Sequence, residues 1–332
     1  MNVFRSLPPA ALAAVGILAG PLAVADTTEV IVYDTFEKPG GYTLADYAAK
    51  WGNPYGLGEM DNVDTRSFDT GALSVSAVPF TVGFDFSVFD HLKYIAISNQ
   101  AFAVPAEGSI TFSSVINAQT PGTEPGRIIE GTYIQGGAPY AAATLEGQQA
   151  GAVMNMINFD TGQLFDWFVA GSTAFTLIER LPSTVTGNTF DPNDPAYVGR
   201  EKMYTQIIDE VEIGPGPHTV AITYTRKNGK ASVEYFLDGK LISKVKDVGV
   251  PLDVQREKYT GISPSLGAGE PLVDKIEYFV IGHGLFSLLD AFPYQHPEAP
   301  ELAVSIPIEN RLFGQGASAT FDDFIVTTRT KQ

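Results

Sequence analysis

Two neighbouring segments of the chain carry acidic, basic and aromatic side chains in a pattern that could bind or transform a saccharide. Asp166 and Trp167 lie in one β-rich run, and Glu179 and Arg180 end the next. A hairpin through residues 170–172 would bring members of the two pairs to one face. Trp stacks on apolar ring faces, and Arg donates a bidentate fork to a carboxylate. The alternative is a structural Arg–carboxylate pair beside a core Trp. Asp166, Glu179 and Arg180 are therefore candidate catalytic residues, and Trp167 is a candidate ligand-binding residue.

His283 is a further candidate catalytic residue, because it stands between two glycines at what we expect to be the end of an apolar strand. An imidazole there can act as a general base or donate to a ligand. The alternative is a turn histidine without a chemical role. In a glycan lyase, Tyr204 and His283 would supply acid and base, and Arg180 would hold a uronate carboxylate. Tyr204 is also a candidate for lining a binding face.

The elements that must position these residues are almost all β-strands. In residues 219–245, apolar and polar residues alternate, and Asn228-Gly229 and Asp238-Gly239 predict type I′ turns. This pattern predicts a three-stranded antiparallel meander with one buried and one wetter face. Residues 42–50 are the one segment whose sequence pattern predicts a helix. Further strands are expected at residues 30–36, 72–78, 94–97, 109–116, 127–134, 151–159, 163–170, 174–180, 204–212, 275–281 and 317–327.

So many short strands without an internal repeat favour one fold class: an all-β, two-sheet antiparallel β-sandwich. We expect residues 26–332 to form a single such domain, since all-β domains often exceed 200 residues. The hydrophobic content of 44% is that of a globular chain. With 0 Cys, the fold depends on core burial, and neither a cysteine nucleophile nor a thiolate metal site is possible.

The net charge of the chain limits the classes of molecule that it is expected to bind. Asp and Glu number 38 against 21 Lys and Arg, a net charge of -17. Such a surface repels phosphate backbones and anionic lipids, so nucleic acid is not an expected partner. Neutral glycans, Ca²⁺ and cationic partners remain compatible with it.

The N-terminus has the pattern of a cleaved signal peptide. Arg5 supplies the positive charge, an apolar stretch follows to about residue 24, and Ala23-Val24-Ala25 offers small residues at a cleavage site. We predict cleavage after Ala25, export to the periplasm or beyond, and no membrane insertion of the mature chain. The alternative, a retained anchor, is less favoured because Pro21 interrupts an apolar run shorter than the roughly 20 residues that a spanning helix needs.

Three motifs give the chain a resemblance to a known superfamily. They are the strand His218–Tyr224, the following Tyr235–Lys240 (YFLDGK), and the C-terminal Ala319–Val326 (ATFDDFIV). Together they resemble signatures of the concanavalin A-like lectin/glucanase superfamily, which includes laminin-G-like domains and family-16 glycoside hydrolases. Residues 151–181 also resemble a poorly characterised group of bacterial secreted proteins of that fold.

The resemblance implies a jelly roll whose concave face suits a saccharide and whose last strand pairs near the first. We expect no required cofactor. The resemblance also implies a possible structural Ca²⁺ between those strands, which here would involve Asp34 and Asp322 or Asp323. The E-x-D-x-x-E motif of family-16 enzymes is absent, which argues against hydrolysis by that machinery.

The leading hypothesis is therefore an exported lectin-like protein that binds a saccharide or another small polar ligand. The alternatives are a glycan hydrolase or lyase with a different active site, and an adhesion module with a protein partner.

Overall fold

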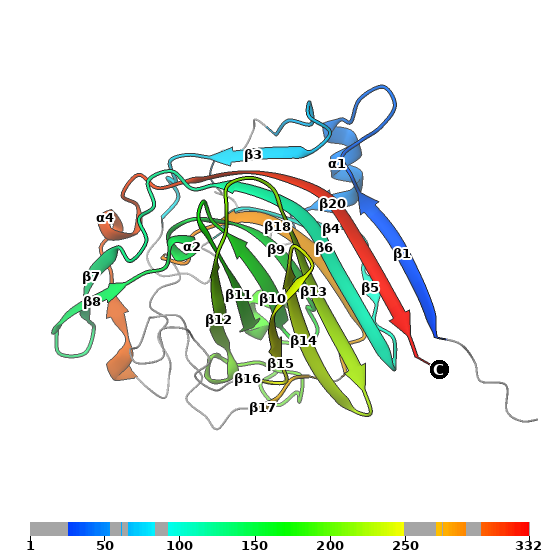
Figure 1. Ribbon diagram of the computed structural model, residues 1–332. Helices are drawn as coiled ribbons and strands as arrows, with labels where there is room; N and C mark the ends of the chain where they lie inside the picture. Colours follow the sequence, from blue (N-terminus) through cyan, green and yellow to red (C-terminus); the bar gives the residue numbers. More distant parts are fainter. Residues whose placement is uncertain are drawn as a thin grey trace, which may run out of the picture.

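The protein is a sandwich of two antiparallel β-sheets, as the sequence predicts (Figure 1). The computed structural model describes residues 26–53, 61, 66–83, 92–248, 270–273, 275–289 and 300–331. Sheet A has the strand order β1-β20-β6-β13-β14-β15, with β3 also paired to β20. Its strands are β1 (Thr27–Asp34), β3 (Leu73–Ala77), β6 (Gly108–Gln119), β13 (His218–Lys227), β14 (Lys230–Leu237), β15 (Lys240–Val245) and β20 (Ala317–Thr330).

Sheet B has the order β12-β11-β10-β9-β18-β4-β2, with β5 also paired to β18. Its strands are β2 (Trp51–Gly52), β4 (Leu92–Ser98), β5 (Phe102–Ala103), β9 (Gly151–Ile157), β10 (Gln163–Val169), β11 (Thr173–Arg180), β12 (Tyr204–Glu212) and β18 (Tyr278–Phe286). Two small sheets accompany them, one formed by β16 (Asp247–Val248) and β17 (Glu270–Pro271), the other by β19 (Val304–Ser305), β7 (Ile128–Tyr133) and β8 (Pro139–Ala143).

The helices are short. They are α1 (Leu44–Lys50), α2 (Glu146–Gln149), α3 (Ser183–Thr186) and α4 (Ile308–Arg311), with 3₁₀ turns η1 (Arg200–Lys202) and η2 (Pro300–Leu302). Thr43 caps α1 through a capping box with Asp46, which explains why the helix predicted for residues 42–50 begins there. No helix in the described part of the chain is long and apolar enough to cross a membrane.

The two sheets differ in how many of their faces are buried. Strand β6 of sheet A alternates between buried and partly exposed residues, so one face of this sheet stays in contact with solvent. Strands β9 and β10 of sheet B are buried at every position. One apolar cluster fills the space between the sheets, and a second covers the other face of sheet B. We call the two exterior-facing sides the outer face of sheet A and the outer face of sheet B.

The predicted meander is confirmed, with β13, β14 and β15 pairing in sequence. Both central residues of each turn have positive φ: 53° and 67° at Asn228-Gly229, and 50° and 77° at Asp238-Gly239. A type I′ turn requires this conformation, which Asn, Asp and Gly tolerate. The predicted pairing of the last strand with the first is confirmed by the β1–β20 register.

One local prediction was wrong. His283 does not end a strand, because β18 continues through it to Phe286. The two flanking glycines permit close packing of that strand: a Cβ on Gly284 would lie 2.3 Å from the carbonyl oxygen of Tyr94. The predicted signal peptide, residues 1–25, lies outside the described residues.

Candidate functional site

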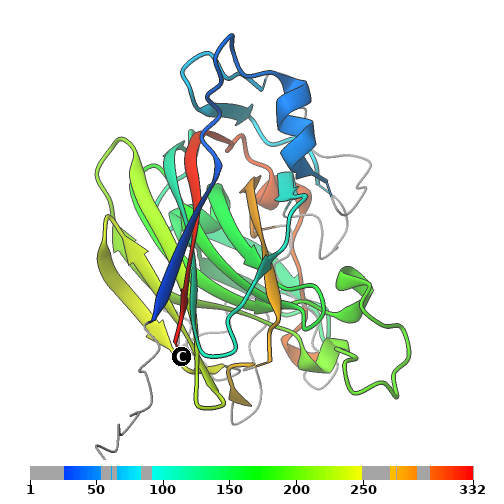
Figure 2. The same ribbon diagram turned by 90° about the vertical axis from the view of Figure 1, so that its right-hand side faces the viewer.

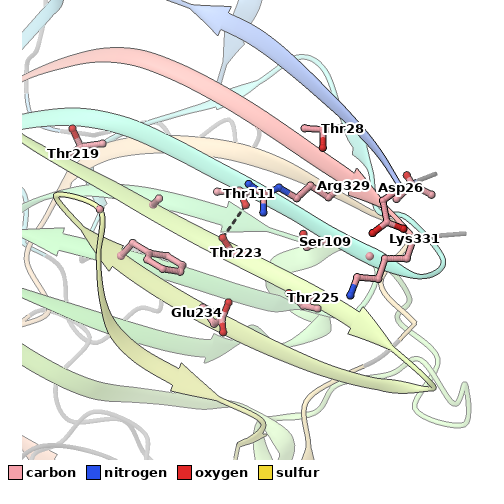
Figure 3. Close-up of a pocket in the computed structure, with 15 residues that line it drawn as sticks. Asp26, Thr28, Ser109, Thr111, Thr219, Thr223, Thr225, Glu234, Arg329 and Lys331 are labelled. Atoms are coloured by element: carbon pink, nitrogen blue, oxygen red, sulfur yellow. Dashed lines mark hydrogen bonds between the residues drawn. The ribbon is translucent and has the colours of Figure 1, made fainter.

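The outer face of sheet A carries a hollow of about 780 Å³, and seven of its fifteen lining residues are Ser or Thr (Figure 3). We call it the hydroxyl hollow. Strands β1, β6, β13, β14 and β20 all contribute to it, and these lie side by side along one flank of the molecule (Figure 1). The lining residues are Asp26, Thr28, Gly108, Ser109, Thr111, Thr219, Ala221, Thr223, Thr225, Glu234, Phe236, Gly239, Arg329, Thr330 and Lys331.

The sheet register arranges these side chains in rows across the strands. Thr111 lies opposite Thr223, and their hydroxyls hydrogen-bond at 2.8 Å, as the dashed line in Figure 3 marks. Ser109 lies opposite Thr225 in the next row. Because residues two apart on a strand share a face, the rows form a grid of hydroxyls about 5–7 Å apart. Each hydroxyl can donate and accept, which matches the hydroxyls of a sugar.

The charges around the hydroxyl hollow are balanced. Asp26 and Glu234 carry the negative charges, and Arg329 and Lys331 carry the positive ones. Glu234 also forms an ion pair with Lys244, whose Nζ lies 2.5 Å from the Glu234 Oε1. The hollow is thus close to neutral in a chain whose net charge is -17, which suits an uncharged ligand.

Phe236 gives the hydroxyl hollow an apolar element. It lies on β14 opposite Ala221, and its ring is partly exposed. An aromatic ring beside hydroxyl donors is the combination that binds the apolar face and the polar rim of a sugar.

The predicted catalytic pair Asp166 and Glu179 does come together, but both side chains are buried on the outer face of sheet B. The two residues lie on adjacent strands, with Asp166 opposite Leu177 and Leu164 opposite Glu179. They are therefore diagonal neighbours on one face, among the apolar side chains of the second cluster. Only 1% of Asp166 and 6% of Glu179 is exposed.

Burial sets the protonation of this carboxyl pair. Asp166 accepts a hydrogen bond from Asn155 Nδ2 at 2.6 Å, and Glu179 accepts one from Thr205 Oγ1 at 2.6 Å. Burial, and next the charge of Glu179, raise the pKa of Asp166 well above its usual value. Burial also raises the pKa of Glu179 from 4.5 to about 7, despite the hydrogen bond from Thr205.

Trp167, Arg180 and Tyr204 face the opposite side of sheet B. Trp167 is fully buried between the sheets, where its Nε1 donates to the carbonyl of Ala221 at 3.1 Å. The guanidinium carbon of Arg180 lies 5.2 Å from the centre of the buried Tyr204 ring. The hairpin therefore forms as predicted, but alternation separates its carboxylates from its Trp and Arg. In this conformation Trp167 has no exposed surface on which a sugar could stack.

His283 lies on the other face of sheet B from the carboxyl pair and shares no hydrogen bond with it. It points into the space between the sheets, where its Nε2 is 3.0 Å from the hydroxyl of Tyr47 and 3.2 Å from that of Tyr94. Those two hydroxyls also contact each other. Burial, together with the positive charge of Arg66, lowers the pKa of His283 to about 3. His283 is thus neutral at ordinary pH and joins α1, β4 and β18.

The predicted calcium ligands have other partners. Asp34 is buried and accepts hydrogen bonds from Trp51 Nε1 at 2.8 Å, Tyr42 at 2.6 Å and Lys50 at 2.9 Å. Asp322 accepts from the backbone N–H of Asp323 at 2.7 Å. Within the described ranges, no group of three or more His, Cys, Asp or Glu side chains is placed to hold a metal ion. Calcium at this position stays a prediction.

A protein-family model matches residues 62–330, and its description is "Family of unknown function (DUF6081)". The chain belongs to family DUF6081. A search of curated proteins found no match to this DUF6081 chain.

Several solved structures resemble the DUF6081 chain at low identity. An endo-1,3-β-glucanase from Streptomyces sioyaensis is 11% identical, with a TM-score of 0.39 over 96% of this chain and 100% of its own. Alginate lyase from Alteromonas sp. 272 is 9% identical, with a TM-score of 0.32 over 86% and 96%. Peanut lectin is 9% identical, with a TM-score of 0.33 over 92% and 99%. Likeness at this level assigns neither a ligand nor a reaction to the DUF6081 chain.

The sequence prediction missed the residues of the hydroxyl hollow. The alternation of Thr219, Thr223 and Thr225 was a signal for a wet, hydroxyl-bearing face of β13. The signal was incomplete, because β6 and β20, which complete the grid, lie about 100 residues away on either side.

Proposed function

We propose that this protein binds neutral saccharides, and that the hydroxyl hollow is the binding site. The observation that carries the proposal is the grid of Ser and Thr hydroxyls in a hollow of about 780 Å³, with Phe236 beside it. A ligand with many hydroxyls can exchange its water contacts for this grid at little cost, because each side chain both donates and accepts. The balanced charges of the lining favour an uncharged glycan over a polyanion.

The sequence pattern of a signal peptide supports an activity outside the cytoplasm, in the periplasm or the medium. Glycans are abundant ligands there, and a Cys-free fold functions there without a disulfide. The enzyme alternative receives no comparable support, because its five proposed residues do not converge. Asp166 and Glu179 lie on one side of sheet B and Arg180 and Tyr204 on the other. His283 lies on that second side as well, but its hydrogen-bond partners are Tyr47 and Tyr94.

The proposal is tested by calorimetric titration of purified protein with a panel of neutral oligosaccharides and polysaccharides. In Thr223→Val, which keeps the side-chain shape and removes one hydroxyl of the central pair, we expect affinity to fall about two- to tenfold, corresponding to one lost hydrogen bond. Phe236→Ala should weaken binding by a similar or larger factor.

Thr320→Val is the matched control, because Thr320 is a partly exposed threonine on β20 that does not line this hollow. Equal losses in Thr320→Val and Thr223→Val would count against the hydroxyl hollow as the binding site. Failure of every neutral glycan to bind would refute the proposed function, and release of new reducing ends would instead favour an enzyme.

A further inference from the structure

A second hollow lies on the outer face of sheet A, at the end of β6 away from the hydroxyl hollow. Its volume is about 270 Å³, and strands β3, β6 and β20 line it. No residue of its lining is charged, although the chain as a whole carries a net charge of -17. We call it the amide hollow, because Asn117 and Gln119 contribute to it.

The sheet register arranges the polar side chains of the amide hollow in two rows. Each row takes one residue from each strand: Ser74, Thr320 and Asn117 in one, and Ser76, Ser318 and Gln119 in the next. Within the described part of the chain, no hydrogen bond engages any of these six side chains. Hydroxyl and amide groups both donate and accept, so the full capacity of the two rows is available to a ligand.

The two hollows meet at β6. Thr219, at one end of the hydroxyl hollow, lies opposite Val115 of β6 (Figure 3). The next outward-facing residue of β6 is Asn117, because residues two apart on a strand share a face. A continuous path therefore leads from β13 across β6 to β20 and β3. Ser109 and Gln119, at the two ends of this path, are ten residues apart on β6, which corresponds to about 34 Å.

Strand β20 borders the same path along its length. It contributes Ser318 to the amide hollow near its start, and Arg329 to the hydroxyl hollow near its end. Figure 2 shows β20, in red, running along the sheet beside β1, in blue, to the C-terminus. Between the hollows, the partly exposed Asp322 lies opposite Val115. A carboxylate at this junction disfavours an anionic ligand and is compatible with a neutral one.

We propose that the hydroxyl hollow and the amide hollow together bind one unbranched, neutral polysaccharide chain that lies along the outer face of sheet A. The inference rests on the proposed saccharide-binding function and adds the length and shape of the ligand. With strands about 4.8 Å apart, a path two or three strands wide measures roughly 10–15 Å across. A site that is much longer than it is wide fits an extended chain better than a compact, branched glycan.

The two hollows should contribute unequally. The hydroxyl hollow offers Phe236 as well as hydroxyls, whereas no aromatic residue lines the amide hollow. Short sugars should therefore bind in the hydroxyl hollow, where an apolar ring face also finds a partner. A chain that is already held there reaches the amide hollow as an intramolecular step, at a high effective concentration. Affinity should consequently rise with chain length.

Calorimetric titration with linear β-1,3- and β-1,4-linked glucose oligomers, from dimers to octamers, tests this inference. We expect wild-type affinity to rise about tenfold or more from the shortest to the longest oligomer. Asn117→Ala and Thr320→Val should each weaken binding of the longest oligomers about two- to tenfold, and leave binding of the shortest unchanged. Thr223→Val, in the hydroxyl hollow, should weaken binding of both.

Thr132→Val is the matched control, because Thr132 is an exposed threonine on β7 that lines neither hollow. It should bind oligomers of every length as the wild type does. Far-ultraviolet circular dichroism and thermal melting check that each variant is folded. Thr320→Val remains the control for the hydroxyl hollow with short oligomers, which do not reach Thr320.

The outcomes separate this inference from the proposed function. If short oligomers bind but affinity does not rise with length, the hydroxyl hollow stands and the extended site is refuted. The same holds if Asn117→Ala and Thr320→Val bind the longest oligomers normally, or if they weaken short and long oligomers equally. If no oligomer of any length binds the wild-type protein, the proposed function and the extended site fail together.

Discussion

Replacing Glu179 with Gln should stabilise the folded protein at alkaline pH and leave its stability at acidic pH nearly unchanged. Glu179 is buried beside Asp166, and burial raises its pKa from 4.5 to about 7. The unfolded chain ionises this carboxyl at its ordinary pKa of about 4.3. The folded state must therefore keep this carboxyl protonated to a higher pH than the unfolded state does, or place a negative charge in an apolar layer.

The sign of the effect follows from proton linkage. Between about pH 4.5 and 7, the folded state binds more protons at this group than the unfolded state, so its contribution to stability falls as pH rises. Well above pH 7 this loss of stability is complete. The pKa shift of Glu179 corresponds to about 3 kcal/mol in the free energy of unfolding. Glutamine keeps the shape of the side chain and can still accept from Thr205, but it does not ionise. The loss should therefore disappear in the variant.

Urea unfolding at pH 4 and pH 8.5 measures this difference. We expect the free energy of unfolding of Glu179→Gln to exceed that of the wild type by about 2–3 kcal/mol at pH 8.5, and to differ little at pH 4. Glu212→Gln removes an exposed carboxyl from the adjacent strand β12 and serves as the control for net charge. A Glu179→Gln effect of equal size at both pH values, or one matched by Glu212→Gln, would refute the reasoning.

Three further variants probe the fold. Trp51→Phe removes the indole donor at 2.8 Å from the buried Asp34, so urea unfolding should show a loss of about 1–3 kcal/mol; an unchanged free energy would mean that the remaining donors suffice. Gly108→Ala would place a Cβ 1.9 Å from the carbonyl oxygen of Arg329 at a φ of 134°. It should lower both the melting temperature and saccharide affinity, and retention of both would show that β6 and β20 can separate there. Asn228→Ala puts a residue without a local hydrogen-bonding side chain at a φ of 53°; it should cost about 1 kcal/mol, whereas Asn228→Gly should not, and equal melting temperatures would contradict this.

The local features of the fold were predictable because short-range rules determine them. Asn228-Gly229 and Asp238-Gly239 supply the positive φ that type I′ turns need, and the flanking alternation then sets the register of the meander. Thr43 caps α1 for an equally local reason. These signals lie within a few residues of the structure that they specify.

The candidate site was only partly predictable, because sheet neighbours and burial depend on distant segments. The hairpin of β10 and β11 was correctly predicted, and so was the proximity of Asp166 to Glu179. The sequence did not reveal that a second apolar cluster covers that face of sheet B. The same limit applies to His283, whose partners Tyr47 and Tyr94 come from α1 and β4.

The difference between the two sheets explains why ligand binding is expected on sheet A. A saccharide-binding site needs many exposed hydrogen-bonding groups, from which the ligand can displace bound water. On the outer face of sheet B, Asp166 and Glu179 are embedded among apolar side chains, and exposing them would also uncover that second cluster. On sheet A, Thr111 and Thr223 already stand at the surface and bond each other, so a ligand exchanges existing contacts without uncovering a core. The sheet with one wet face can therefore bind a saccharide without rearranging.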